Sequence, residues 1–299
     1  MGIIALIHDH VHEEAEFFLS IDQIMVLYIC IWLAVFGLIW GSFADCAVSR
    51  WAEGKKGLKL FTGRSHCLSC GHELGVVDLL PVAGYLIRRG KCRYCGEKIP
   101  ADCLAAEIAG AVGFVLVGLR FGPSAELGLW YLLTSGDPRL LVTSLLLVQW
   151  VIFAAILLIL SLTDAAKRII PDRLLVALAA NRVIWFFVRR EDWSVALDAL
   201  KACIVPAALL ALVLLAEKLL DREVMGGGDI KLLFALALYL SWAQLLLTLL
   251  AGCLAGLIFA ALARKKSGTA MPFGPFLAAG ALVVVCFCDP LIQWYFGLF

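Results

Sequence analysis

Two aspartates stand at the edges of long apolar runs, where an unpaired charge is costly in lipid. Asp164 ends the run 140–163, and Asp229 begins a second run. Charged residues at such positions in membrane proteins are functional candidates. The structural alternative is that both are ordinary interfacial residues. Asp164 would then pair with Lys167 or Arg168, and Asp229 would be favoured by the dipole at a helix N-terminus.

The residues around the two aspartates favour a shared site. Asp229 follows Gly226-Gly227-Gly228, and three glycines let a backbone pass close to a neighbouring helix or an extended substrate. Asp164 precedes Ile170-Pro171-Asp172, where the proline opens the next helix. Two carboxyls brought together cannot both ionise cheaply, so they share one proton. One then activates water while the other donates a proton, which is aspartic protease chemistry.

A second constellation consists of two CxxC motifs. Cys67 and Cys70 form the first, Cys92 and Cys95 form the second, and 21 residues separate the pairs. Each motif puts two sulfurs on one tight turn, and two such turns can close a tetrahedron around Zn²⁺. A glycine follows each pair, as a turn with positive φ favours. We expect structural zinc; the alternative of two disulfides is disfavoured in a reducing cytoplasm.

The composition indicates that most of the chain lies in lipid. Of its 299 residues, 63% are hydrophobic and only 16% are charged, and the mean hydropathy is +0.95. These values lie far outside the range of soluble domains. The net charge of +1 gives no indication of nucleic-acid binding. The first twenty residues lack a basic region and a small-residue cleavage site, so no removable signal peptide is predicted.

Eight apolar segments have roughly the length of about 20 residues that crosses a bilayer. They cover residues 23–44, 103–119, 141–163, 173–188, 197–216, 229–242, 244–263 and 275–297. Residues 127–133 could instead form a re-entrant or interfacial piece. We therefore expect an all-α polytopic membrane protein with about eight transmembrane helices.

The distribution of Lys and Arg predicts the orientation, because basic loops are retained in the cytoplasm. Residues 45–102 contain ten Lys or Arg, whereas residues 1–22 contain none. The tail is then outside, and both aspartates fall on the cytoplasmic side. Arg189 and Arg190 are the main exceptions. The predicted organisation is a tail (1–22), a first transmembrane helix (23–44), a cytoplasmic Cys-rich zinc-binding domain (45–102) and a membrane-embedded protease domain (103–299).

Several motifs occur in an order that is typical of one family. They are Gly41-Ser42-Phe43; the two CxxC motifs with Asp78-Leu79-Leu80-Pro81 between them; Gly90-Lys91-Cys92-Arg93-Tyr94-Cys95; Asp164 followed by Ile170-Pro171-Asp172; Gly226-Gly227-Gly228-Asp229 with Lys231; and Pro272-Phe273-Gly274-Pro275. With these motifs the chain resembles the prepilin peptidases, which are type IV leader peptidases of the GxGD membrane aspartic protease type. Asp45-Cys46 and Cys103 depart from the family pattern at the mouth of the Cys-rich loop.

The resemblance implies a multi-pass enzyme of the bacterial inner membrane with Asp164 and Asp229 as catalytic residues. Such enzymes remove the leader peptide from type IV prepilins or type II secretion pseudopilins at the cytoplasmic face. Many members also methylate the new N-terminus with S-adenosylmethionine, and the Cys-rich loop is associated with that activity. Glu107, inside the second span, is a weak candidate for binding the cofactor or the substrate amine; alternatively, it pairs with a nearby Arg.

Two other functions stay open at this point. A GxGD protease could act on another substrate, such as archaeal preflagellin, although those relatives lack the Cys-rich loop. From another class, a polytopic transporter or a cation or proton channel could use the two membrane aspartates, since fold alone does not determine function. The zinc motif has no evident use there. The preferred pilin and the oligomeric state cannot be read from the sequence.

Overall fold

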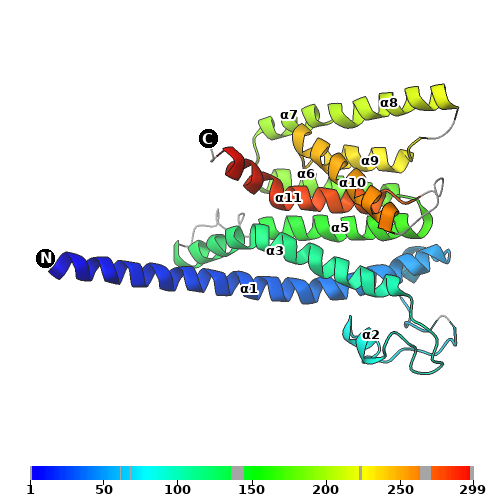
Figure 1. Cartoon of the computed structure of the whole chain (residues 1–299), viewed down its shortest axis with the longest axis horizontal. Helices are drawn as coiled ribbons and strands as arrows, with labels where there is room; N and C mark the ends of the chain where they lie inside the picture. The colour runs from blue at the N-terminus through cyan, green and yellow to red at the C-terminus, as the bar shows by residue number, and fades with distance from the viewer. Residues whose placement is uncertain are drawn as a thin grey trace.

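Long helices run side by side in the computed structural model, and the Cys-rich segment projects near one end of them (Figure 1). The structure describes the backbone of residues 2–60, 62–67, 69–135, 145–221, 224–262 and 271–296, and the side chains of these except 2–23, 58, 124–135 and 289–296. In these residues the regular structure is helical. Strand pairing there is limited to two isolated bridges, His66 with Glu73 and Lys91 with Lys98.

The helices follow the apolar segments of the sequence. They are α1 (Gly2–Ala52), η1 (Gly57–Leu60), α2 (Ala83–Ile87), α3 (Ala101–Ser135), α5 (Leu146–Lys167), α6 (Asp172–Val188), α7 (Trp193–Ala202), α8 (Ile204–Leu220), α9 (Gly227–Leu236), α10 (Trp242–Leu262) and α11 (Gly274–Phe296). Each of the eight expected spans overlaps a helix, and 197–216 overlaps both α7 and α8. The expected end of the sixth span is wrong, because α9 stops at Leu236 and Trp242 begins α10. Residues 141–144 and 297 of the expected spans lie outside the described residues. Residues 127–133 continue α3, and residues 2–22 continue α1.

Not all of these helices are long enough to cross a bilayer. In the described part of the chain, five stretches have the length and apolar composition of a span: Ile24–Ala52, Ala101–Pro123, Leu146–Lys167, Trp193–Leu220 and Trp242–Leu262. A shorter apolar stretch covers Gly274–Cys288. The ten residues of α9 rise only about 15 Å, half of the roughly 30 Å hydrocarbon layer. The fold is thus helical and polytopic, with α9 at the place of the short sixth span.

Helix α5 lies at the centre and contacts α1, α3, α6 and α11. Its residues Phe153, Leu157 and Leu160 recur at helical spacing and are buried in the core. They share that core with Leu232 and Leu236 of α9. The outward faces are apolar as well, and Leu254 and Leu257 of α10 are among the many large apolar side chains that are exposed. Such a surface suits lipid.

Glycines allow α1 and α3 to cross closely. A Cβ at Gly37 would collide with the carbonyl oxygen of Gly110, and a Cβ at Gly41 would collide with that of Ala106. Gly37 and Gly41 are four residues apart and therefore lie on the same face of α1. Since lipid supplies no hydrophobic drive between helices, close backbone packing of small residues is what holds such a pair together.

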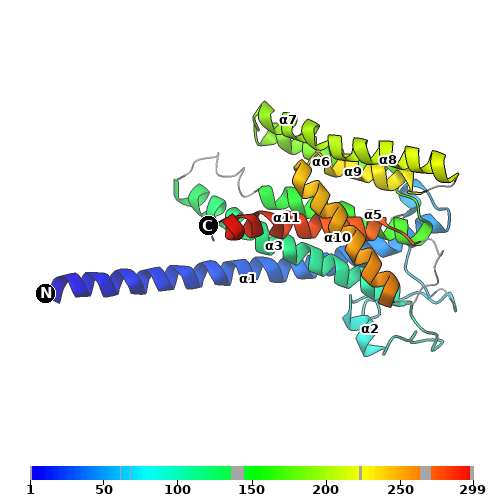
Figure 2. The same ribbon diagram turned by 45° about the horizontal axis from the view of Figure 1, so that its top comes forward.

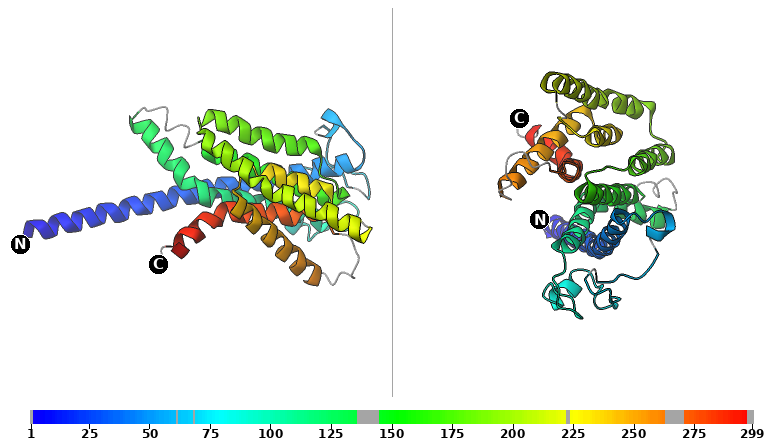
Figure 3. Two further views of the ribbon diagram at one scale, coloured as in Figure 1. Left: turned by 90° about the horizontal axis from the view of Figure 1, so that it is seen from above. Right: turned by 90° about the vertical axis from the view of Figure 1, so that its right-hand side faces the viewer.

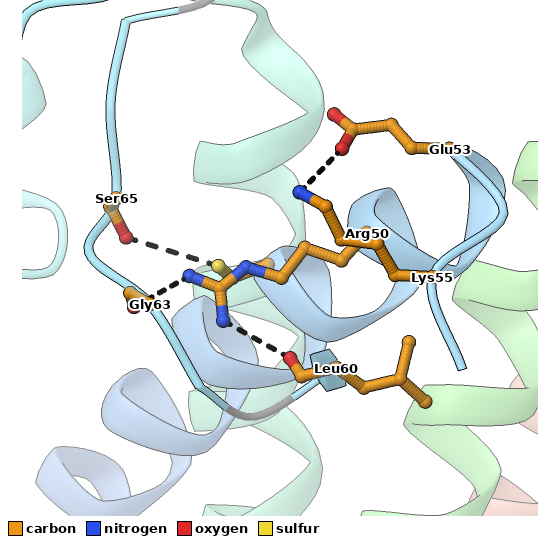
Figure 4. A network of polar contacts seen from close by, with 7 residues as sticks. Arg50, Glu53, Lys55, Leu60, Gly63 and Ser65 are labelled. Atoms are coloured by element: carbon orange, nitrogen blue, oxygen red, sulfur yellow. Dashed lines mark hydrogen bonds and ion pairs between the residues drawn. The ribbon is translucent and has the colours of Figure 1, made fainter. Parts of the chain in front are cut away.

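The Cys-rich segment leaves the end of α1 and returns to the start of α3. Figure 4 shows Arg50, in the last turn of α1, donating to the carbonyl oxygens of Leu60 and Gly63 at 3.1 and 2.9 Å. One turn earlier in α1, Cys46 Sγ lies 3.8 Å from Ser65 Oγ. These contacts fold the first part of the segment back onto the helix end.

The close crossing of α1 and α3 predicts that a larger residue at the crossing lowers the stability of the protein. Gly37→Ala should lower the free energy of unfolding by about 1–3 kcal/mol, because the added methyl meets backbone that cannot move aside. Gly122→Ala is the matched control on α3, since its Cβ would meet only Ile29 at an ordinary 3.7 Å. Thermal unfolding of the purified proteins in detergent measures both. Equal melting temperatures for the two variants would contradict the close crossing.

Candidate active site

The two aspartates lie at the same end of the helices. Asp164 is in the last turn of α5, and Asp229 is in the first turn of α9. Figures 1 and 2 show that these helix ends meet at the end of the bundle where the Cys-rich segment is attached. Gly228, which precedes Asp229, packs against Ile170 in the segment that follows Asp164. Residues 65 positions apart thus lie at the same end of the bundle.

The carboxyl of Asp164 is bound by a backbone amide. The side chain is buried, and its Oδ2 accepts a hydrogen bond from the N–H of Gly274 at 2.9 Å. Gly274 begins α11, so this donor is one of the amides that a helix N-terminus leaves unpaired. Of the expected ion-pair partners, Lys167 lies over the ring of Trp51, with its Nζ 5.0 Å from the ring centroid.

Only glycine fits at position 274. A Cβ there would lie 2.7 Å from Asp164 Oδ2, in the space that the hydrogen bond uses. The sequence analysis noted Pro272-Phe273-Gly274-Pro275 only as part of a resemblance and assigned it no role. The available signal was a glycine between two prolines just before an apolar run. This glycine positions the loop that binds the carboxyl.

The glycines before Asp229 have different surroundings. Gly228 packs against the segment that follows Asp164, because a Cβ there would lie 3.2 Å from the Cβ of Ile170. Gly226 precedes α9 in an extended conformation, and its carbonyl accepts from the N–H of Asp229 at 3.1 Å. Gly227 is exposed, and a Cβ there would meet nothing within 4 Å. One of the three glycines therefore makes the expected close approach to another element, and one faces open space.

The other predicted site residues lie at the rim. Lys231 Nζ is 2.8 Å from Asp172 Oδ1, which joins α9 to the start of α6. Both side chains are more than half exposed, so this pair contributes at most about 1 kcal/mol. Pro171 precedes the first turn of α6 with φ −66°, as expected for a proline that opens a helix. These residues lie on the elements that begin just after Asp164 and at Asp229.

A buried polar cluster that the sequence analysis missed ties the same helices together at their other ends. The side-chain amide of Asn181, on α6, donates to Tyr239 Oη at 2.9 Å and to the carbonyl of Gln149, on α5, at 3.3 Å. Tyr239 follows α9 and donates to the carbonyl of Leu178 at 2.7 Å. Polar residues inside apolar runs were the available signal. The helices that carry the aspartates are thus linked at both ends.

The four cysteines of the CxxC motifs converge. Their sulfurs all lie within 4.8 Å of one another, and Cys67 Sγ is 3.8 Å from Cys95 Sγ. Sulfurs that surround zinc at about 2.3 Å in a tetrahedron are also about 3.8 Å apart. A disulfide would need about 2.05 Å, and all four cysteines are free. The donor set therefore fits a tetrahedral metal ion.

The two CxxC turns have the same internal hydrogen bonds. The N–H of Cys67 donates to the carbonyl of His72, and that of Gly71 donates back to the carbonyl of Cys67; Cys92, Glu97 and Gly96 repeat the pattern. The positive φ expected of the glycines is confirmed at 71° for Gly71 and 74° for Gly96. Backbone N–H groups of Cys70 and Ser69 lower the pKa of the Cys67 thiol, whereas hydrogen bonds with the other three thiols raise the pKa of Cys95.

Glu107 connects the Cys-rich segment to α3. Its carboxylate is buried and accepts a hydrogen bond from the N–H of Val82 at 2.7 Å. Val82 has a φ of 58° and directly follows the motif 78–81. Nearby, Asp45 and Cys103, which both depart from the expected pattern, are hydrogen-bonded to each other. The two departures thus form one contact between α1 and α3.

Comparison with known proteins agrees with this arrangement. The family model of the bacterial peptidase A24 N-terminal domain matches residues 35–121, and that of the type IV leader peptidase family matches residues 151–261. The first covers the Cys-rich segment and its flanking helices. The second begins in α5 and ends in α10, so it contains both aspartates.

Curated relatives match along most of the chain, whereas no solved structure gives a significant match. The prepilin leader peptidase/N-methyltransferase of Bacillus subtilis is 30% identical over 274 residues, which cover 88% of this chain and 96% of the relative. The protein of that name from Pseudomonas putida is 31% identical, covering 76% and 73%, and the one from Pseudomonas aeruginosa is 29% identical, covering 87% and 90%. The chain belongs to the type IV leader peptidase family.

Proposed function

We propose that this chain is a membrane aspartic endopeptidase that removes the leader peptide from type IV prepilins or pseudopilins and methylates the new N-terminus. The observation that carries the proposal is the meeting of Asp164 and Asp229 at one end of the bundle, each positioned by a glycine contact. The relatives that share most of the chain bear both activities in their name. This family membership leaves the transporter or channel alternative without support.

The two carboxyls have different roles in hydrolysis, one as the base and the other as the acid. The Gly274 amide stabilises negative charge on Asp164, so Asp229 carries the shared proton before reaction. The carboxylate takes a proton from the attacking water as its oxygen bonds to the scissile carbonyl carbon. The protonated carboxyl gives its proton to the carbonyl oxygen. Collapse of this intermediate breaks the C–N bond, and the leaving amine takes up a proton from the pair.

An extended substrate has room beside Asp229. Gly227 is exposed with no neighbour at the position of a Cβ, so a peptide backbone can pass close to the start of α9. We place this site at the cytoplasmic face of the bacterial inner membrane, because the basic segment 45–102 lies at the same end of the helices.

The Cys-rich segment would hold one structural zinc ion through Cys67, Cys70, Cys92 and Cys95. The ion would join two otherwise separate turns, and it has no assigned part in the peptidase reaction. The rings of His72 and Tyr94, with centroids 3.5 Å apart and planes tilted by 35°, also connect the two turns. The segment 45–102 would then act as a small domain of its own.

For the methyl transfer, S-adenosylmethionine would supply the methyl group to the new N-terminal amine. The junction of α1 and α3 carries three acidic residues, Asp45 in the last part of α1 and Asp102 and Glu107 in the first part of α3. A cationic sulfonium or amine suits such surroundings. We propose Glu107 as the residue that binds the donor or the amine, with the Val82 amide keeping its carboxylate in place.

The aspartate pair gives the first functional prediction. Asp164→Asn and Asp229→Asn should each lower the rate of prepilin cleavage by about 10³-fold or more, because neither amide can share the proton. Cleavage of a purified prepilin by enzyme in detergent measures this. Asp198→Asn, at an exposed acid of α7, should cleave like the wild type. Wild-type cleavage by either of the first two variants would remove the proposed mechanism.

The glycine at position 274 gives a second functional prediction. Gly274→Ala places a methyl 2.7 Å from Asp164 Oδ2, and the displaced carboxyl should lower kcat by about 10–100-fold with little change in KM. Gly256→Ala is the control, because its Cβ would contact the Phe276 ring at an ordinary 3.6 Å. Steady-state cleavage kinetics separate kcat from KM. An unchanged kcat would mean that the amide of residue 274 does not position the carboxyl.

The metal is tested directly. Purified protein should carry about one zinc per chain by elemental analysis, and Cys67→Ser should lose most of it. Cys253→Ser, at an exposed thiol on α10, should keep the wild-type content. Full zinc loading of the Cys67 variant would contradict the site.

A further inference from the structure

One surface of the Cys-rich segment is apolar although the segment lies outside the helical bundle. We define the α2 patch as Val76, Val77, Leu79, Leu80, Leu86 and Ile87. Every member is more than 40% exposed, and Val76 reaches 82%. A contiguous run of such side chains on a polar domain marks a surface that another partner covers.

The patch is held in a defined shape by an ion pair beneath it. Arg88 Nε and Nη2 lie 3.1 and 3.0 Å from Asp78 Oδ1, and the carboxyl of Asp78 is largely buried. Asp78 also accepts from the N–H of Gly75 at 3.2 Å. Gly84 of α2 packs so closely on the backbone of Asp78 that a Cβ would lie 2.6 Å from its carbonyl oxygen. The segment 76–80 and α2 are therefore joined into one unit.

The position of this unit indicates what covers it. Seen along the helices, the Cys-rich segment lies beside the bundle and not over its end (Figure 3, right). In Figures 1 and 2, α2 is the part of the segment that reaches furthest back along the long helices. Because α1 and α3 have the length and composition of membrane spans, a unit beside their ends lies over lipid.

The exposed side chains that follow α2 carry a net positive charge. Between residues 89 and 98 the exposed charged residues are four basic and one acidic: Arg89, Lys91, Arg93, Lys98 and Glu97. Apolar side chains flanked by cations are the combination that binds the interface of an anionic bilayer. A positively charged peptide would be repelled by the same cations, which makes lipid the better match.

We propose that the α2 patch inserts into the headgroup layer of the membrane and that Arg89, Lys91 and Arg93 bind anionic phospholipid. The Cys-rich domain then rests on the bilayer beside the bundle and is attached at a third point besides α1 and α3. This inference depends on the membrane location of the helices and not on the peptidase activity.

The full-length protein in nanodiscs of phosphatidylcholine and phosphatidylglycerol in equal amounts tests the proposal. A photoreactive benzophenone amino acid replaces Ile87, and mass spectrometry identifies what it labels on illumination. The same substitution at Leu254, an exposed apolar residue of α10, gives the yield for a lipid-facing position. At Ser69, an exposed polar residue outside the patch, it gives the background. The proposal requires Ile87 to label lipid well above Ser69 and near Leu254.

A charge variant identifies the lipid class. With the label at Ile87, the double substitution Arg89→Ser and Lys91→Ser should lower the preference for phosphatidylglycerol by about an order of magnitude. Arg64→Ser with Lys201→Ser removes the same charge elsewhere and should leave the preference unchanged. Unchanged zinc content shows that each variant keeps its fold. Labelling of Ile87 at the Ser69 level, or labelling of a second protein chain or of added prepilin instead of lipid, would overturn the proposal.

Discussion

A carboxyl buried at the end of a membrane helix must find polar partners within the protein, because lipid offers none. Asp164 meets this demand with the amide of Gly274, 110 residues away in the chain. The N-terminus of α11 must therefore lie against the C-terminus of α5, and only a residue without a side chain can stand at the contact. The position of α11 in the bundle and the identity of residue 274 both follow from this one hydrogen bond.

Glycines also stand at other contacts between elements. Gly37 and Gly110 bring α1 against α3, and Gly228 brings α9 against Ile170. In water, larger apolar side chains at such crossings would be favoured by the hydrophobic effect. In lipid, close backbone contact and internal polar bonds supply the attraction instead. The Asn181 and Tyr239 side chains act in this way at the far end of the helices, so the distance between the aspartates depends on contacts at both ends.

Much of this arrangement can be predicted from the sequence, because it depends on local patterns. The apolar runs predict the helices, the CxxC spacing predicts a converging set of four sulfurs, and Gly71 and Gly96 adopt the positive φ that their turns need. The meeting of Asp164 with Gly274, or of Asn181 with Tyr239, joins residues that no periodicity relates. Such contacts depend on how helices pack, and a single sequence records only that a glycine or a polar residue is present.

Within the described residues, polar contacts join the two parts of the chain that match separate family models, and one of them lies close to Asp164 in the sequence. Trp40 Nε1 on α1 donates to the carbonyl of Ala155 on α5 at 3.3 Å, and Lys167 Nζ donates to the carbonyl of Trp51 at 3.5 Å. Lys167 is three residues from Asp164, and Trp51 is in the last turn of α1, just before the Cys-rich segment. The carbonyl of Trp51 is therefore a point at which the end of α1 meets the turn of α5 that holds Asp164.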